Sequence, residues 1–277
     1  MTNSRQLIVT GIPRSGTTLL AALVDSLADA VCLSEPDWQS LWSQEMTDRA
    51  AYVNRITRDF ERVRATLLAG TAVPDRRDAR LKPVTDYFTR GAGGQRQQTF
   101  EVRELRRAGL TPNFLLGMKH NAHYTCVLSE LLRVKNLEAL AIVRNPVSTI
   151  LSWRSLKIPI GQGRLPAAER FWPEIPALWQ TTNDLLEVQV RIYGLFCQRY
   201  KETAGRLVVI KHEELVEDPT MLERLFARRY ARHVRVQAQH QSDVQAADET
   251  TTIRRYIQKF CPVAYEFYPN LDDPAQR

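Results

Sequence analysis

The sequence lacks a long hydrophobic run. None of its apolar stretches approaches the ~20 consecutive residues that a transmembrane helix needs, and no signal peptide is visible. We therefore expect a cytoplasmic protein with no membrane span.

Cysteine is scarce, and its spacing excludes two common roles. The four cysteines form no Cys-x-x-Cys pair and lie far apart along the chain, at Cys32, Cys126, Cys197 and Cys261. This spacing fits neither a zinc site nor the disulfide framework of a small secreted domain. We expect buried thiols in a reducing cytosol.

Positive charge is in excess but is not gathered into a basic run. Lys and Arg number 38 against 31 acidic residues, and the formal net charge is +7. Paired arginines such as Arg76-Arg77 and Arg254-Arg255 are scattered. The pattern therefore does not favour nucleic acid as a partner. A small polyanionic ligand and a merely basic, solvated surface both fit it.

Short apolar runs alternate with segments of helical periodicity. Strands are predicted at 7–10, 31–34, 114–118, 137–143 and 207–210. Helices are predicted from residue 17, over 38–69 with a break near its start, over 124–134, from residue 146, over 178–200 and around 253–260. This alternation predicts an α/β fold with a central parallel β-sheet flanked by helices. The length of 277 residues fits one domain, 1–277, with glycine- and proline-containing insertions or lids near 70–98 and 161–176.

The first predicted strand runs into the loop Gly11-Ile12-Pro13-Arg14-Ser15-Gly16-Thr17-Thr18. Its G-x-x-x-x-G spacing, between a strand and a helix, suits a phosphate because N–H groups at the helix start point at one anion. A nucleoside triphosphatase has Lys after the second glycine, whereas this chain has Thr17 there and carries its cation inside the loop, as Arg14. The strand at 137–143 ends in Arg144 rather than in a magnesium ligand. Metal-assisted ATP chemistry is therefore disfavoured.

A second anion site is predicted where the strand at 137–143 meets the next helix. Arg144 ends the strand, Asn145 suits the N-cap and Pro146 suits the first helical position. Ser148 and Ser152 are four residues apart and share a helix face. Together with the N–H groups of the first turn, these side chains are expected to surround a phosphate.

These two segments resemble the donor site of the sulfotransferases that use 3′-phosphoadenosine 5′-phosphosulfate (PAPS). The stretch from Pro13 to Thr18 resembles their 5′-phosphosulfate loop, in the bacterial form with Arg in place of Lys, and Arg144 with Ser152 resembles their 3′-phosphate site. The resemblance implies a P-loop-like sulfotransferase fold, PAPS as donor, adenosine 3′,5′-bisphosphate as product and no metal. The donor-binding residues that it implies are Pro13, Arg14, Ser15, Gly16, Thr17, Thr18, Arg144 and Ser152.

The resemblance also implies roles at the reacting centre. Arg14 is expected to stabilise the leaving phosphate, and Lys119, at a strand end, to add a second cation. Our preferred base is Glu35, since related members use a carboxylate in this region, with burial expected to raise its pKa. His120 is the second candidate and His123 a further rival, because the family's histidine position is occupied by Asn121.

The acceptor is less well defined. The loop type favours a hydroxyl of a carbohydrate, a glycolipid or a small secondary metabolite. We expect its walls in 70–98 and 161–176, with Trp153, Trp172 and Trp179 nearby. The segment 209–219 resembles a strand-then-"YEDL…DP" stretch that we interpret as structural. A homodimer is left open, and two alternatives remain: a P-loop kinase or ATPase, and a non-catalytic nucleotide-binding protein of the same fold.

Overall fold

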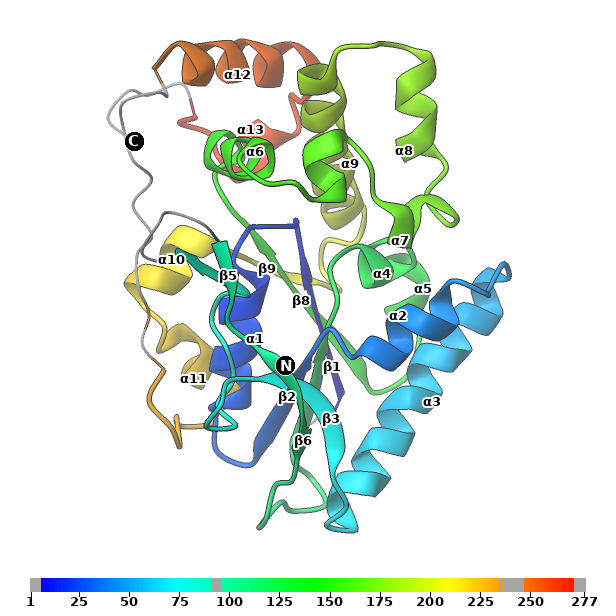
Figure 1. Ribbon diagram of the computed structural model, residues 1–277, viewed down its shortest axis with the longest axis vertical. Helices are drawn as coiled ribbons and strands as arrows, with labels where there is room; N and C mark the ends of the chain where they lie inside the picture. The colour runs from blue at the N-terminus through cyan, green and yellow to red at the C-terminus, as the bar shows by residue number, and fades with distance from the viewer. Residues whose placement is uncertain (1–5, 91–95, 235, 237–246, 272–277) are drawn as a thin grey trace.

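The centre of the molecule is a five-stranded parallel sheet. The computed structural model describes residues 6–90, 96–234, 236 and 247–271, and its central strands follow the order β2-β7-β1-β8-β9 (Figure 1). They are β1 (Gln6–Gly11), β2 (Ala30–Ser34), β7 (Leu115–Lys119), β8 (Leu137–Val143) and β9 (Val208–Lys211). Every neighbouring pair is parallel. The predicted α/β fold class is confirmed.

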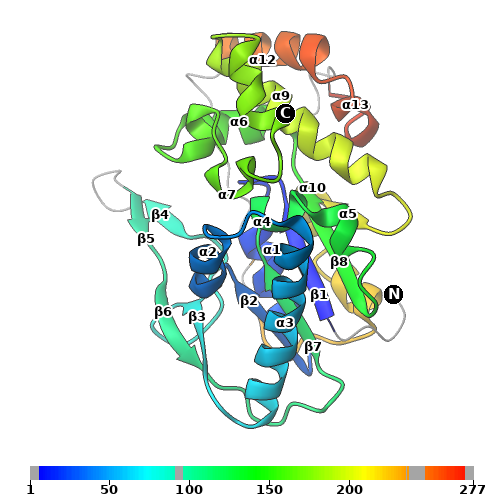
Figure 2. The same cartoon turned by 90° about the vertical axis from the view of Figure 1, so that its right-hand side faces the viewer.

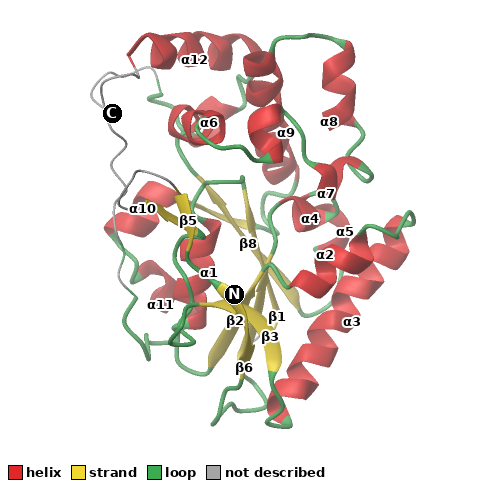
Figure 3. Ribbon diagram, viewed as in Figure 1, coloured by secondary structure: helices red, strands yellow, loops and turns green. Residues whose placement is uncertain are grey.

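Helices cover both faces of this sheet, because the strand residues alternate between two hydrophobic cores. In β1, Leu7 and Val9 pack into one core and Ile8 into the other. The first core is closed by α1 (Thr17–Asp25), α10 (His212–Glu217) and α11 (Met221–Phe226). The second includes residues of α3 (Arg49–Leu68) and α9 (Leu185–Glu202), and Figure 3 shows α3 beside the sheet.

A group of helices lies beyond the carboxyl ends of the strands, above the sheet in Figure 1. Its members are α6 (Pro146–Arg154), part of α9, α12 (Ala247–Phe260) and α13 (Ala264–Phe267). Helices α6, α9 and α12 pack on one another. Because α6 follows β8 directly, this group of helices covers the carboxyl ends of the strands, where ligands of parallel α/β proteins bind.

Some predicted helices are shorter than expected. The segment 38–69 divides into α2 (Asp37–Ser43) and α3, as predicted, but 124–134 forms only the short helices α4 (Ala122–Thr125) and α5 (Leu128–Leu131). Helix α9 begins at Leu185 rather than near 178, because the side chain of Asp184 caps it by accepting from two N–H groups. The segment 161–176 contains α7 (Pro166–Glu169) and α8 (Glu174–Ala177), and 3-10 turns lie at Pro159–Gln162 and Leu178–Gln180.

The segment 70–98 contains more strand than its composition suggested. Strand β3 (Val73–Arg77) pairs antiparallel with β6 (Glu101–Leu105), and β4 (Phe88–Arg90) pairs antiparallel with β5 (Arg96–Gln98). Figure 2 shows these two strand pairs beside β2, at the edge of the sheet. We call the described residues between Val73 and Leu105 the arm. Strand β3 was not predicted because two of its buried residues, Asp75 and Arg77, are charged rather than apolar.

Candidate active site

The loop between β1 and α1 has an internal framework that positions its backbone. Ser15 is fully buried, and its hydroxyl donates to the carbonyl oxygens of Ile12 at 2.5 Å and Ile142 at 2.8 Å. Arg14 and Gly16 have φ values of 68° and 95°, which is the left-handed region that lets successive N–H groups converge on an anion. The hydroxyl of Ser15 therefore shapes the loop. Of the backbone and hydroxyl groups that we expected Ser15 to offer to the ligand, the hydroxyl is already bonded within the protein.

The two predicted anion sites differ in how their helices begin. The N-terminus of α1 has no side-chain cap, so its first-turn N–H groups are left for a ligand. In α6, the side chain of Asn145 accepts from the N–H groups of Val147 and Ser148. The expectation that the first turn of α6 binds a phosphate through its N–H groups is therefore wrong.

A cavity of about 660 Å³ opens at the carboxyl ends of the central strands. Most of the predicted donor and catalytic residues reach it, together with residues of the arm. Its lining includes Pro13, Arg14, Gly16, Thr17, Thr18, Glu35, Arg76, Asp78, Val84, Thr85, Asp86, Tyr87, Phe88, Phe100, Lys119, Asn121, Arg144, Ile158 and His212.

Lys119 and Glu35, which both line this cavity, form an ion pair. Lys119 ends β7 and is 1% exposed, and its Nζ lies 2.5 Å from Oε1 of Glu35. Glu35 follows β2 with a φ of 52°, a strained conformation of the kind that concentrates at functional sites. Although burial alone would raise it, electrostatic interactions, first with Lys119 and then with His120 and Arg76, hold the pKa of Glu35 down at about 2. The expected upward shift of this pKa is wrong for this arrangement.

The loop arginine connects three parts of the cavity. Arg14 Nε donates to Oγ of Ser152 in α6 at 3.4 Å, and its Nη1 lies 3.2 Å from Oδ1 of Asp86 in the arm. Arg144 lines the same cavity from the end of β8. Arg14 and Arg144, proposed for two separate phosphates, therefore line one cavity, whereas Ser152 contacts Arg14 but is not among the lining residues.

Neither candidate histidine lines the cavity. His120 is 4% exposed, and no described group bonds to its buried Nε2. Burial and the neighbouring His123 hold the pKa of His120 well below its ordinary value. Nδ1 of His123 lies 2.6 Å from the hydroxyl of Tyr52, and burial lowers the pKa of His123 to about 4. Both rings are neutral at pH 7, but they face the core between the sheet and α3.

Two cavity residues were missed by the sequence analysis. Arg76, on β3, contacts Glu35 and Asp37, and nothing local in its sequence signals this role. His212, at the start of α10, lies against Gly16, where an added Cβ would collide with its ring. Burial and the charge of Arg144 lower the pKa of His212 to about 4. The 209–219 segment, interpreted as structural, thus brings a neutral imidazole to the phosphate loop.

The three tryptophans do not line this cavity. Trp153 and Trp172 are at most 1% exposed, and the indole N–H of Trp153 donates to the carbonyl of Pro13 at 2.7 Å. Trp179 donates to the carbonyl of Gly163. The aromatic walls of the cavity come instead from Tyr87, Phe88 and Phe100 of the arm.

Two features are absent from the described residues. No helix in them is long and apolar enough to span a bilayer. No group of three or more His, Cys, Asp or Glu side chains among them is arranged to hold a metal ion.

Comparisons with known proteins give a likeness to solved structures but no match by sequence. No protein-family model matches the chain, and no curated protein matches its sequence. Among solved structures, the chain is similar to a sulfotransferase from Alicyclobacillus acidocaldarius, with a TM-score of 0.43 and 13% sequence identity. The alignment covers 92% of this chain and 93% of that one.

Proposed function

We propose that this protein transfers a sulfuryl group from PAPS to a hydroxyl group of an acceptor. The observation that carries the proposal is the convergence of the uncapped α1 N-terminus, Arg14, Lys119 and Arg144 on one cavity. A donor that carries a phosphosulfate and a second phosphate needs these features. The absence of a lysine after Gly16 distinguishes the loop from that of a nucleoside triphosphatase.

The residues present fit PAPS as a ligand. Gly16 lacks the Cβ that would collide with the ring of His212, so the loop and the start of α10 approach each other closely where both line the cavity. Asn121 lines the cavity, and its buried Oδ1 has no partner among the described residues. In this proposal the loop holds the 5′-phosphosulfate, and Arg144 with Ser152 holds the 3′-phosphate. Nε of Arg14 donates to Oγ of Ser152, so the two sites are adjacent.

The reaction is an in-line displacement at sulfur. The acceptor oxygen forms a bond to sulfur while the bond from sulfur to the bridging phosphate oxygen breaks, and adenosine 3′,5′-bisphosphate leaves with that bond's electron pair. Arg14 and Lys119 stabilise the charge that develops on the sulfuryl and bridging oxygens. The acceptor proton passes to Glu35.

Geometry favours Glu35 over His120 as the base. Glu35 reaches the cavity beside Lys119, and its carboxylate is ionised at neutral pH and so accepts a proton. His120 lies outside the lining, and its Nε2 is enclosed in the core. The low pKa makes Glu35 a weak base as long as Lys119 is its partner, and it strengthens when Lys119 turns to the sulfuryl oxygens.

The acceptor side of the cavity is formed by the arm. Tyr87, Phe88 and Phe100 offer aromatic faces, and Thr85 and Asp78 offer hydrogen-bonding groups. This mixture suits a sugar ring or an aryl metabolite that carries a hydroxyl. We extend the proposal to acceptors of these classes.

Transfer of radiolabelled sulfate from PAPS tests this function. The purified protein is incubated with labelled PAPS and a panel of glycosides and phenols, and the products are separated by chromatography. We expect a labelled product with wild-type protein and a loss of about 10²–10⁴-fold in turnover with Glu35→Gln. Exchange of γ-phosphate from ATP/Mg²⁺, without transfer from PAPS, would instead favour the kinase alternative.

A further inference from the structure

Arg76 divides its guanidinium between two carboxylates beside the reacting centre. Its Nη1 lies 2.7 Å from Oε2 of Glu35, and its Nη2 lies 2.7 Å from Oδ1 of Asp37. The side chain is 18% exposed, and its buried Nε has no hydrogen-bond partner among the described residues. The bond to Asp37 holds the planar guanidinium in place, and the bond to Oε2 holds one oxygen of the Glu35 carboxylate.

Aromatic rings hold this guanidinium in place. The Cζ atom of Arg76 lies 5.2 Å from the ring centre of Tyr87 and 5.0 Å from that of Phe100. The hydroxyl of Tyr87 lies 2.8 Å from Oγ of Ser34, the residue before Glu35. The arm therefore holds Arg76 between the rings of Tyr87 and Phe100, and Tyr87 itself is fixed to β2 by its contact with Ser34.

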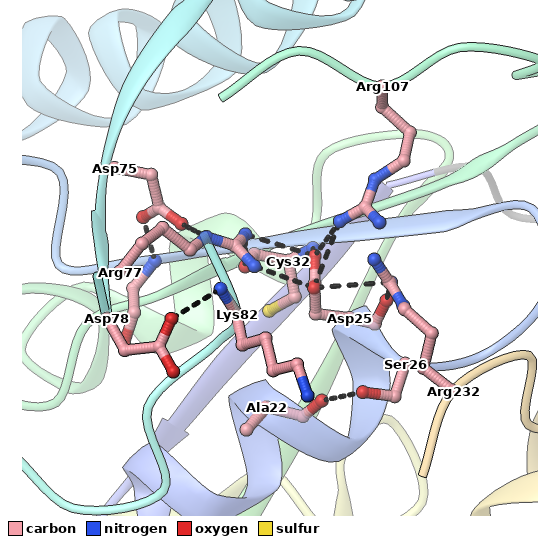
Figure 4. Close-up of polar contacts among 11 residues, drawn as sticks. Ala22, Asp25, Ser26, Cys32, Asp75, Arg77, Asp78, Lys82, Arg107 and Arg232 are labelled. Carbon is pink, nitrogen blue, oxygen red and sulfur yellow. Dashed lines mark hydrogen bonds and ion pairs between the residues drawn. The ribbon is translucent and has the colours of Figure 1, made fainter. Parts of the chain in front are cut away.

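The backbone of β3 is anchored next to Arg76. Arg77 is fully buried, with Nη1 2.7 Å from Oδ2 of Asp25 and Nε 2.6 Å from Oδ2 of Asp75 (Figure 4). The same two carboxylates accept N–H groups of β2, so the cluster binds β3 to the edge of the central sheet. Because neighbouring residues of a strand point in opposite directions, locking Arg77 on one side fixes where Arg76 projects on the other.

The two oxygens of Glu35 have different partners. Oε1 meets Lys119, whose Nζ is also 3.5 Å from Oγ1 of Thr18 in the donor loop, whereas Oε2 meets Arg76. Lys119 thus stands between the base and the donor, while Arg76 lies on the side of Asp37 and the arm. We propose that Arg76 is a positioning residue: it holds Oε2 of Glu35 so that Oε1 faces the acceptor hydroxyl. This inference rests on the proposed sulfuryl transfer.

The step that Arg76 serves is the proton transfer. As the acceptor oxygen bonds to sulfur and the bond from sulfur to the bridging oxygen breaks, the hydroxyl proton passes to Oε1 of Glu35. Arg76 keeps its bond to Oε2 throughout and neither gains nor loses a proton. The charged and titratable groups that face Glu35 are Lys119, Arg76, His120, His123 and Tyr87, with Asp37 on the far side of Arg76.

The test compares Arg76→Met, Arg76→Lys and Arg80→Met in turnover of PAPS, with water as the acceptor so that no acceptor has to be identified. Arg80 is an exposed residue of the same arm and serves as the matched control. We expect kcat of Arg76→Met to fall about 10–100-fold. The pH at which kcat falls in acid should rise by about one unit in Arg76→Met, because the Glu35 carboxylate loses a neighbouring positive charge. Arg76→Lys should restore part of both effects, and Arg80→Met should match wild type.

A double variant separates positioning from a general loss of structure. If Arg76 acts through Glu35, Glu35→Gln/Arg76→Met loses no more kcat than Glu35→Gln alone. Additive losses, or a lower kcat with no change in the pH at which it falls in acid, would overturn the proposal. Titration of wild-type protein with adenosine 3′,5′-bisphosphate tests the donor site separately. If wild type binds the bisphosphate but Arg76→Met keeps the wild-type kcat, the role of Arg76 alone is rejected. If wild type does not bind it, the sulfotransferase function itself is rejected.

Discussion

Lys119 ends β7, Glu35 directly follows the neighbouring strand β2, and two hydrogen bonds connect the two residues. The main-chain N–H of Glu35 donates to the carbonyl of Lys119 at 2.9 Å, and the side chains pair at 2.5 Å. The backbone bond extends the β2–β7 ladder by one residue beyond the pairing of Ser34 with Lys119. The proposed cation for the donor and the proposed base for the acceptor are thereby fixed side by side at the carboxyl end of the sheet.

The first prediction concerns acid stability. The pKa of Glu35 falls from 4.5 to about 2 on folding, so its stabilising effect is present above pH 4.5 and is lost as the pH falls towards 2. Glu35→Gln should therefore be less stable than wild type at pH 7, by about 1–3 kcal/mol. The difference should shrink below pH 4.5. Urea unfolding at several pH values measures it, with the exposed Glu174→Gln as control; a difference that grows in acid would contradict the assigned pairing.

The second prediction concerns the phosphate loop. Gly16 has a φ of 95°, and a Cβ there would strike His212. Gly16→Ala should lower affinity for adenosine 3′,5′-bisphosphate roughly tenfold or more, since the loop must shift. Gly70 has a φ of 71° and nothing within 4 Å of an added Cβ. Gly70→Ala should cost stability alone, about 1 kcal/mol; equal losses of binding in both variants would refute the loop assignment.

The third prediction separates two hydroxyls of the same loop. Ser15 donates to two buried carbonyls, so Ser15→Ala should reduce the free energy of unfolding by about 1–3 kcal/mol. Thr18 lines the cavity with its hydroxyl near Lys119. Thr18→Ala should change stability by less than about 0.5 kcal/mol while weakening nucleotide binding. Calorimetry and urea unfolding of both variants check this, and the reverse order of effects would be inconsistent with the geometry.

The fourth prediction concerns the cluster that anchors the arm. Asp25 forms ion pairs with three arginines, whereas among the described residues Asp75 forms one, with Arg77. Burial raises the pKa of Asp75 from 3.8 to about 6. Because the folded state holds this proton more tightly, the stabilisation is present below pH 3.8 and is lost as the pH rises through 6. Wild type should therefore lose about 1–3 kcal/mol relative to Asp75→Asn between pH 4 and pH 7. Parallel stability curves would show that Asp75 is already ionised at pH 4.

Local signals predicted much of the fold and part of the site. Apolar runs placed the central strands, and the rule that ligands meet strand ends placed Arg14, Lys119 and Arg144 near one another. One inference conflicted with another: Asn145 was predicted as an N-cap, and a capped helix start cannot offer the same N–H groups to a phosphate. The structure resolves this conflict in favour of the cap.

The remaining site residues depend on contacts that no local pattern reports. Arg76 meets Glu35 because β3 crosses the edge of β2, held there by buried charges rather than by an apolar repeat. His212 meets Gly16 because β9 lies beside β8. The low pKa of Glu35 likewise follows from Arg76 as well as Lys119, and only Lys119 was identified from the sequence.

The most direct test of the donor assignment is calorimetric titration with adenosine 3′,5′-bisphosphate, 5′-AMP and ATP/Mg²⁺. Arg144→Met is compared with wild type and with the exposed Arg133→Met. We predict that the bisphosphate binds wild type and Arg133→Met at least roughly tenfold more tightly than 5′-AMP, and that Arg144→Met abolishes this preference. Tighter binding of ATP/Mg²⁺, or equal affinity for the bisphosphate and 5′-AMP in wild type, would contradict a site built for PAPS.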